Sequence, residues 1–72
     1  MAITRSSLDN WFSYHAPNDL QREQYEILRA AALQFAAVIL DQTPASADQT
    51  TAIRKVREAV MTANAAIACG GQ

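Results

Sequence analysis

The sequence predicts an all-α protein in which a short N-terminal helix precedes a long antiparallel helical hairpin. No stretch shows the apolar/polar alternation of a strand, and the only glycines, Gly70 and Gly71, come at the C-terminal end. The two prolines, Pro17 and Pro44, divide the chain into an opening segment and two long segments. In both long segments apolar residues return with the 3.6-residue period of a helix, so both are predicted to be helical.

The opening segment has the signals of a short helix over about residues 7–14. Ser7, together with Asp9 and Asn10, supplies side chains that favour a helix start. Pro17 is expected to end the helix, because the residue before a proline is forced out of the helical region.

The first long helix is predicted over about residues 19–42, with Asn18 or Asp19 as its N-cap. Its predicted core stripe follows the 3.6-residue period of a helix and contains Leu20, Leu28, Ala31, Phe35 and Ile39.

The second long helix is predicted over about residues 47–68. Ser46 with Gln49 three positions later has the pattern of a capping box, and Gly70 suits the left-handed turn that ends many helices. The short connection around Pro44 requires the two long helices to run antiparallel. The predicted stripe facing the first helix contains Ile53, Val56, Val60, Ala63 and Ile67.

The size of the chain indicates one domain, residues 1–72, that does not stabilise itself alone. A 72-residue domain has a small core, and half of its residues are apolar, with alanine the commonest of them. Its single cysteine, Cys69, cannot form an intramolecular disulfide, and no residues have zinc-site spacing. Leu33 and Leu40 fall roughly 140° around the helix from Phe35, so a lone hairpin leaves both in water. Homo-oligomerisation is therefore expected.

Composition and motifs exclude several classes of function. The net charge of −1 disfavours a protein that binds DNA or RNA polymers, and the connection between the long helices is too long for a helix-turn-helix reader. No apolar run spans a membrane and no signal peptide is recognisable, so a cytosolic protein is expected. No catalytic constellation, metal-binding cluster or cofactor motif occurs, which argues against an enzyme, and Cys69 has no assignable role.

Candidate ligand-binding residues gather just ahead of the first long helix, where Trp11, Phe12, Tyr14 and His15 lie close together. Tyr14 is the strongest candidate, because a phenol ring can stack on a nucleobase while its hydroxyl reaches a polar atom. Trp11 and Phe12 can equally well form an apolar latch that seals the end of the hairpin.

The long helices add two arginines on otherwise apolar faces. Arg29 suits a phosphate, which a guanidinium holds through two parallel hydrogen bonds, although a pair with Glu26 is the alternative. Arg57 has no acidic residue four positions away, and Met61 and Asn64 follow it on the same face. A helical asparagine such as Asn64 needs a partner for its amide, either a base edge or a neighbouring subunit.

Three stretches resemble a known family. The segments WFSYHAP, YEILRAAALQFA and VREAVMTANAAIA are similar to the small phage proteins that sequester cyclic oligonucleotides and so silence CBASS anti-phage signalling, with relatives that act against Thoeris signalling. The likeness extends from about Trp11 to Ala68. It implies an all-helical sponge, assembled as a homo-hexamer, that binds its ligands without cleaving them in the cytoplasm of the infected bacterium.

The resemblance also implies where ligands bind. Cyclic dinucleotides of the 3′,3′-cyclic GMP-AMP class would stack on Tyr14 and have their phosphates held by Arg29, with Trp11, Phe12 and His15 nearby. Cyclic trinucleotides such as cyclic tri-AMP, which some members bind, would use Arg57, with Met61 and Asn64 lining the same region. The competing hypothesis from the residues is a small helical adaptor or inhibitor that binds a protein partner through Leu33 and Leu40.

Overall fold

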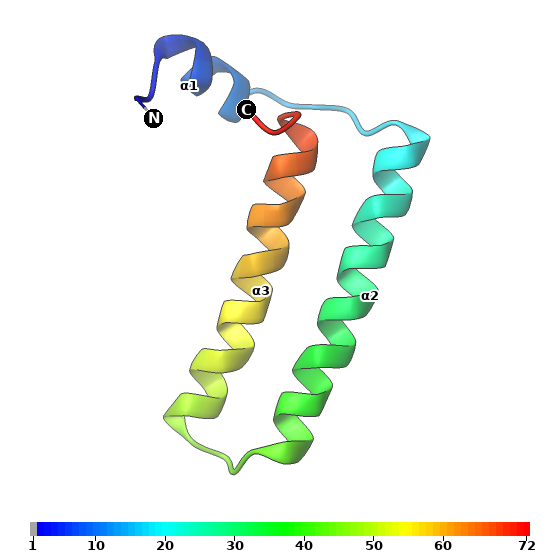
Figure 1. The fold of residues 1–72 in the computed structure, drawn as a ribbon, viewed down its shortest axis with the longest axis vertical. Coiled ribbons are helices and arrows are strands. Elements are labelled where there is room, and N and C mark those ends of the chain that lie inside the picture. The colour runs from blue at the N-terminus through cyan, green and yellow to red at the C-terminus, as the bar shows by residue number, and fades with distance from the viewer. Residues whose placement is uncertain (1) are drawn as a thin grey trace.

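The computed structural model describes residues 2–72, which form three helices and no strand (Figure 1). Helix α1 spans Arg5–Trp11, α2 spans Asp19–Gln42 and α3 spans Ala47–Ala68. The long helices α2 and α3 have the ranges that the sequence predicts and pack antiparallel as a hairpin. The described chain measures 44 × 30 × 17 Å. Helix α1 lies beside the C-terminus at the end of α3, and residues 12–18 cross from there to the start of α2 (Figure 1).

Helix α1 lies earlier in the chain than the predicted range of 7–14. Thr4 is its N-cap, because the Thr4 hydroxyl accepts a hydrogen bond from the Ser7 amide at 3.1 Å. Ser7 is therefore the third helical residue and completes a capping box with Thr4 instead of starting the helix. The helix ends at Trp11, well before Pro17. The Ser13 hydroxyl donates a hydrogen bond to the carbonyl of Asp9. A side chain that competes for a helix carbonyl ends the helix here, and proline does not.

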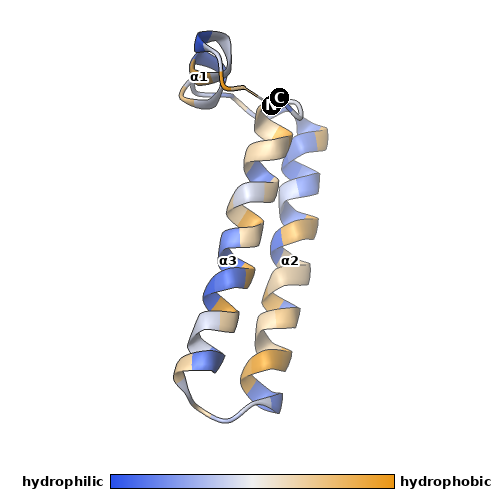
Figure 2. Ribbon diagram, turned by 60° about the vertical axis from the view of Figure 1, so that its left-hand side comes forward, coloured by the Kyte–Doolittle hydropathy of each residue, from blue (hydrophilic) through white to orange (hydrophobic). Residues whose placement is uncertain are grey.

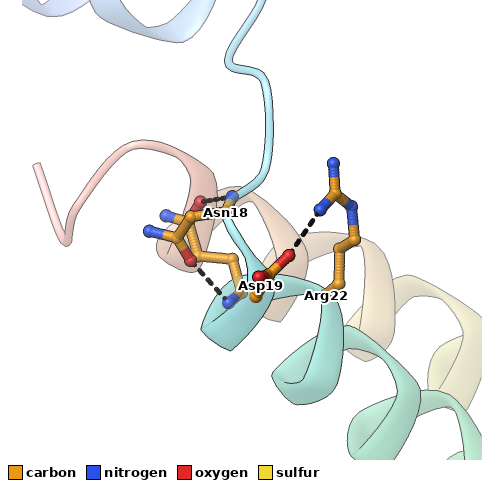
Figure 3. A network of polar contacts seen from close by, with 4 residues as sticks. Asn18, Asp19 and Arg22 are labelled. Atoms are coloured by element: carbon orange, nitrogen blue, oxygen red, sulfur yellow. Dashed lines mark hydrogen bonds and ion pairs between the residues drawn. The ribbon is translucent and has the colours of Figure 1, made fainter.

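The start of α2 is fixed by a reciprocal capping box. Asn18, one of the two predicted caps, accepts through its side-chain Oδ1 from the main-chain N–H of Gln21 at 2.8 Å. In return the side-chain Oε1 of Gln21 accepts from the main-chain N–H of Asn18 at 3.0 Å (Figure 3). Beside it, Asp19 and Arg22 form an ion pair of 2.9 Å on the surface (Figure 3). The Gln21 side chain also donates to the carbonyl of Ile67 at 3.4 Å, which ties the start of α2 to the end of α3.

The predicted capping box at the start of α3 forms only in part. Ser46 accepts from the Gln49 amide at 3.1 Å, as expected of an N-cap. The Gln49 side chain does not reach back to Ser46; it donates to the carbonyls of Leu40 at 3.2 Å and Thr43 at 3.0 Å. These carbonyls lie at the end of α2 and have no partner within that helix, so they attract the amide. Gln49 thereby joins the two long helices across the loop.

The end of α3 is a Schellman turn. The Gly71 amide donates to the carbonyl of Ala66 at 2.8 Å and the Gly70 amide to that of Ile67 at 3.2 Å. Both glycines have positive φ, +65° and +78°, so the left-handed turn predicted at Gly70 is present and continues into Gly71.

The hairpin seam agrees with the predicted stripe on α3 but not with that on α2. All five predicted α3 residues are half-buried. On α2, Leu28 and Ile39 are half-buried, whereas Leu20, Ala31 and Phe35 are exposed, with Phe35 at 58%. The apolar part of the α2 seam consists of Tyr25, Leu28, Ala32, Ala36 and Ile39. The small side chains of Ala32 and Ala36 allow the helices to approach, and Phe35 therefore lies at the edge of the seam.

No side chain among residues 2–72 is buried, because two helices cannot enclose a core. Leu33 and Leu40 are 73% and 57% exposed, as the hairpin geometry predicts. Hydrophobic residues gather in the part of α2 nearer the loop to α3, whereas α3 carries a hydrophilic band near its middle (Figure 2). A large share of the apolar surface of the described chain is therefore open to solvent.

Candidate functional site

The two predicted arginines of the hairpin line a common groove, called here the arginine groove. Arg29 follows the seam residue Leu28 on α2, and Arg57 follows the seam residue Val56 on α3. One step along a helix turns the side chain by 100°, so both arginines lie at the margin of the seam on the same face. The groove has a volume of about 290 Å³ and is otherwise lined by Ala32, Leu33, Ala36, Ile53, Val56, Val60 and Met61.

Neither arginine of this groove has an acidic partner in the described chain. The only ion pair among residues 2–72 joins Asp19 and Arg22, outside the groove. The alternative pairing of Arg29 with Glu26 is therefore not formed. Two guanidinium groups above an apolar floor suit an anionic ligand, because each can hold a phosphate oxygen pair while the ligand's apolar parts contact the floor.

The segment between α1 and α2, residues 12–18, presents two aromatic rings to solvent. Phe12 is 85% exposed and Tyr14 is 87% exposed. The Tyr14 side chain forms no hydrogen bond with another described residue. An open phenol ring of this kind can stack on a nucleobase without first breaking an internal contact.

Trp11 and His15 are engaged within the chain. The indole N–H of Trp11 donates to the main-chain oxygen of Gln72 at 2.8 Å, and the residue is 44% exposed. Nε2 of His15 lies 2.6 Å from the carbonyl oxygen of Asn10, and this nitrogen is the donor because a carbonyl can only accept. The Cys69 thiol donates to the same oxygen at 3.8 Å, so His15 and Cys69 meet at one acceptor.

Tyr14 and Arg29 do not share a pocket within one chain. Arg29 lies ten residues after the start of α2, which corresponds to about 15 Å along the helix axis, whereas Tyr14 precedes that start. Arg29 lines the arginine groove, and Tyr14 is not among the residues that line it. The chain thus presents the predicted stacking ring and the predicted phosphate contact at separate places.

The three predicted ligand-binding residues of α3 do not all lie in one groove. Arg57 and Met61 line the arginine groove, and Met61 is 63% exposed. Asn64 is half-buried further along the seam, and its Oδ1 has no hydrogen-bond partner. That oxygen is itself enclosed, so in the single chain it lacks the partner that a helical asparagine requires and is not open to a ligand.

A second apolar groove lies on the opposite face of the seam and was missed by the sequence reasoning. Phe35 lies at its edge, and it has a volume of about 410 Å³. The remaining lining residues are Leu28, Ala31, Ala32, Val56, Ala59, Val60 and Ala63. The feature of the sequence that could have indicated this groove is the run of alanines beside Phe35. Helices that pack through small residues leave a depression between them.

Two further observations concern metal binding and membrane insertion. Within residues 2–72 no three histidine, cysteine or acidic side chains gather as they would around a metal ion. Neither long helix has an apolar stretch sufficient to span a bilayer.

The family model described as Acb2/Tad1, hairpin domain, matches residues 5–68, nearly the whole chain. The chain belongs to the Acb2/Tad1 hairpin family. This is the anti-CBASS sponge family that the sequence resembles, and the helical hairpin of the structure agrees with the domain description. Comparisons with curated proteins and with solved structures gave no match. Membership in the Acb2/Tad1 hairpin family fits an anti-defence role, in which a phage protein counteracts bacterial immunity.

Proposed function

We propose that this chain is a phage immune-evasion protein that binds cyclic oligonucleotide second messengers, does not cleave them, and so blocks CBASS signalling. The observation that carries the proposal is the arginine groove, in which Arg29 and Arg57 lack acidic partners and lie on an apolar surface. A cyclic dinucleotide combines two phosphates with two flat bases and therefore matches unpaired guanidinium groups and an open aromatic ring.

The proposed dinucleotide site uses Tyr14 to stack on a base and Arg29 to hold the phosphates, with Trp11, Phe12 and His15 around Tyr14. Ligands of the 3′,3′-cyclic GMP-AMP class are proposed for it. Because Tyr14 and Arg29 lie apart in one chain, we propose that each pocket combines Tyr14 of one subunit with Arg29 of another. Arg57, Met61 and Asn64 are proposed to contact cyclic trinucleotides such as cyclic tri-AMP.

A homo-oligomer, proposed to be a hexamer, would complete these pockets and cover the apolar surface. Leu33, Phe35 and Leu40 are each more than half exposed in the single chain. Covering side chains of this size contributes about 1.5–3 kcal/mol each, a substantial stabilisation for so small a domain. The protein is proposed to act in the cytoplasm of the infected bacterium.

Sequestration by mass action requires only tight binding of the ligand at a fixed stoichiometry to the protein. Nanomolar affinity corresponds to about −12 kcal/mol. Stacking contributes about 1–3 kcal/mol per base, and charge-assisted phosphate contacts contribute about 1.5–3 kcal/mol each. Two bases and two phosphates, each with several contacts, bring the total into this range.

Isothermal titration against a panel of cyclic di- and trinucleotides tests the proposal, with the corresponding linear dinucleotides as controls. The expected result is saturable heat with at least one cyclic ligand and recovery of that ligand intact after the protein is denatured. Absence of heat with every cyclic ligand contradicts binding, and recovery of a linear product contradicts sequestration without cleavage. An adaptor acting through Leu33 and Leu40 would bind no nucleotide and would run as a small species on size exclusion.

A further inference from the structure

The segment that carries Tyr14 is attached to the last turn of α1. On one side of Tyr14, the Ser13 hydroxyl donates to the carbonyl of Asp9. On the other side, the His15 ring donates to the carbonyl of Asn10 at 2.6 Å. The Tyr14 side chain has no hydrogen bond to another described residue, so the position of its ring depends on its two neighbours and, through them, on α1.

Helix α1 is in turn attached to the C-terminal turn, residues 69–72. The Asn10 side chain donates to the carbonyl of Cys69 at 3.2 Å, and the Cys69 thiol donates to the carbonyl of Asn10 at 3.8 Å. The Trp11 indole donates to the main-chain oxygen of Gln72 at 2.8 Å. Residues 59 to 61 positions apart in the chain meet here, and α1 and the C-terminus lie side by side in the ribbon (Figure 1).

The C-terminal turn is itself rigidly placed on α3. Its two glycines have positive φ, and their amides donate to carbonyls of the last turn of α3. A seven-residue helix such as α1 is not stable by itself in water, so its orientation depends on these contacts. A continuous set of hydrogen bonds therefore extends from the end of α3 to both neighbours of Tyr14.

We propose that the C-terminal turn positions the Tyr14 ring for ligand binding by holding α1 through Asn10 and Trp11. Asn10 and Gly71 are positioning residues in this scheme and do not touch the ligand. The inference rests on the proposed stacking role of Tyr14. Its physical basis is that a ring held in its binding orientation loses less conformational entropy when the ligand arrives.

Two substitutions loosen this attachment by different means. Asn10→Ala removes the side-chain donor to Cys69 and leaves the main-chain carbonyl that His15 uses. Gly71→Ala places a side chain at a φ of +78°, a strained conformation for alanine, although an added Cβ meets no atom within 4 Å. Gln42→Ala, which removes an exposed amide at the opposite end of the hairpin, is the matched control.

The test combines three measurements on the full chain. Trp11 is the only tryptophan, so its fluorescence emission reports the attachment of α1 directly. Backbone NMR order parameters at Tyr14 and His15 report the order of that segment. Isothermal titration with a cyclic dinucleotide reports binding, and circular dichroism checks that the hairpin remains helical.

In Asn10→Ala and Gly71→Ala we expect Trp11 emission at longer wavelength, lower order parameters at Tyr14 and His15, and cyclic dinucleotide affinity about tenfold weaker, with unchanged helicity. Gln42→Ala should resemble the wild type. Unchanged order parameters at Tyr14 in both variants would overturn the inference, as would lower order parameters with wild-type affinity. If the wild type binds no cyclic nucleotide, the proposed function fails, while emission and order parameters still decide whether the C-terminal turn orders the Tyr14 segment.

Discussion

Arg29 on α2 and Arg57 on α3 each follow a seam residue by one position, and both line the arginine groove without an acidic partner among the described residues. The family resemblance implies a different ligand for each of these residues, yet within one chain they share a surface. Like charges on one apolar groove repel each other unless an anion lies between or near them. The groove is therefore better suited to an anionic occupant than to a purely apolar one.

Arg29→Ala is expected to weaken cyclic dinucleotide binding by roughly 10- to 100-fold, because a lost charge-assisted hydrogen bond costs about 1.5–3 kcal/mol. Arg29→Lys should retain part of the affinity, since it keeps the charge and loses the two-pronged contact. Isothermal titration measures both effects. Arg22→Ala is the matched control, because it removes a surface guanidinium outside the groove.

Arg57→Ala is expected to lower cyclic trinucleotide affinity by a similar factor while dinucleotide affinity changes little. The two ligands are titrated separately into the same variant. Equal losses for both ligands would mean that Arg29 and Arg57 serve one shared pocket, and the proposal of two sites would have to be abandoned.

Tyr14→Ala is expected to reduce cyclic dinucleotide binding by about 1–3 kcal/mol per stacked base, whereas Tyr14→Phe should keep most of the affinity. The ring is 87% exposed in the single chain and makes no hydrogen bond to a described residue, so helicity by circular dichroism should be unchanged in both variants. Wild-type affinity in Tyr14→Ala would remove this residue from the site.

Gln49→Ala is expected to destabilise the protein by about 1–2 kcal/mol, because two hydrogen bonds to carbonyls at the end of α2 are lost. Denaturation by urea, followed by circular dichroism, measures the free energy of unfolding. Gln42→Ala, an exposed neighbour without such bonds, should change it by less than about 0.5 kcal/mol. Equal stability of the two variants would show that the Gln49 contacts contribute nothing.

The sequence predicts the long helices well because their ends carry strong local signals. Asn18 and Ser46 are residue types that favour N-caps, and each accepts from the main-chain N–H three residues later. Gly70 marks the end of α3. The seam of α2 is predicted less well, since runs of alanine give little indication of which face packs. Phe35 is one of the two aromatic residues of that helix, but the seam passes through Ala32 and Ala36 beside it.

The contacts of α1 could not be predicted from local patterns. Asn10 and Trp11 find their partners at Cys69 and Gln72, some 60 positions away, and main-chain acceptors leave no signature in a sequence. The partners of the Gln49 side chain are main-chain carbonyls too, so they could not be predicted either. The spacing from Ser46 had indicated a capping-box bond instead. The aromatic cluster before α2 was recognisable, but its division into an engaged Trp11 and an open Tyr14 depends on the placement of α1.

The lack of any buried side chain in the described chain leads to a prediction about assembly. Phe35 and Leu33 lie on the two faces of the hairpin seam, each beside an apolar groove. Light scattering after size exclusion is expected to give a multiple of the 7.9 kDa chain mass. The melting temperature should rise with protein concentration, because folding and association are then linked.

Replacing either side chain by glutamate tests which face is used. If both faces pack against neighbouring subunits, Leu33→Glu and Phe35→Glu should each lower the mass of the assembly and reduce helicity, because burying an unpaired charge costs several kcal/mol. Glu23→Lys, a charge change at an exposed position of α2, is the control. A stable, fully helical monomer in the wild type would contradict the argument, since two helices with no buried residue would then have to be stable alone. If only one variant dissociates, the other face remains open, and the ligand pockets must form at the face that assembles.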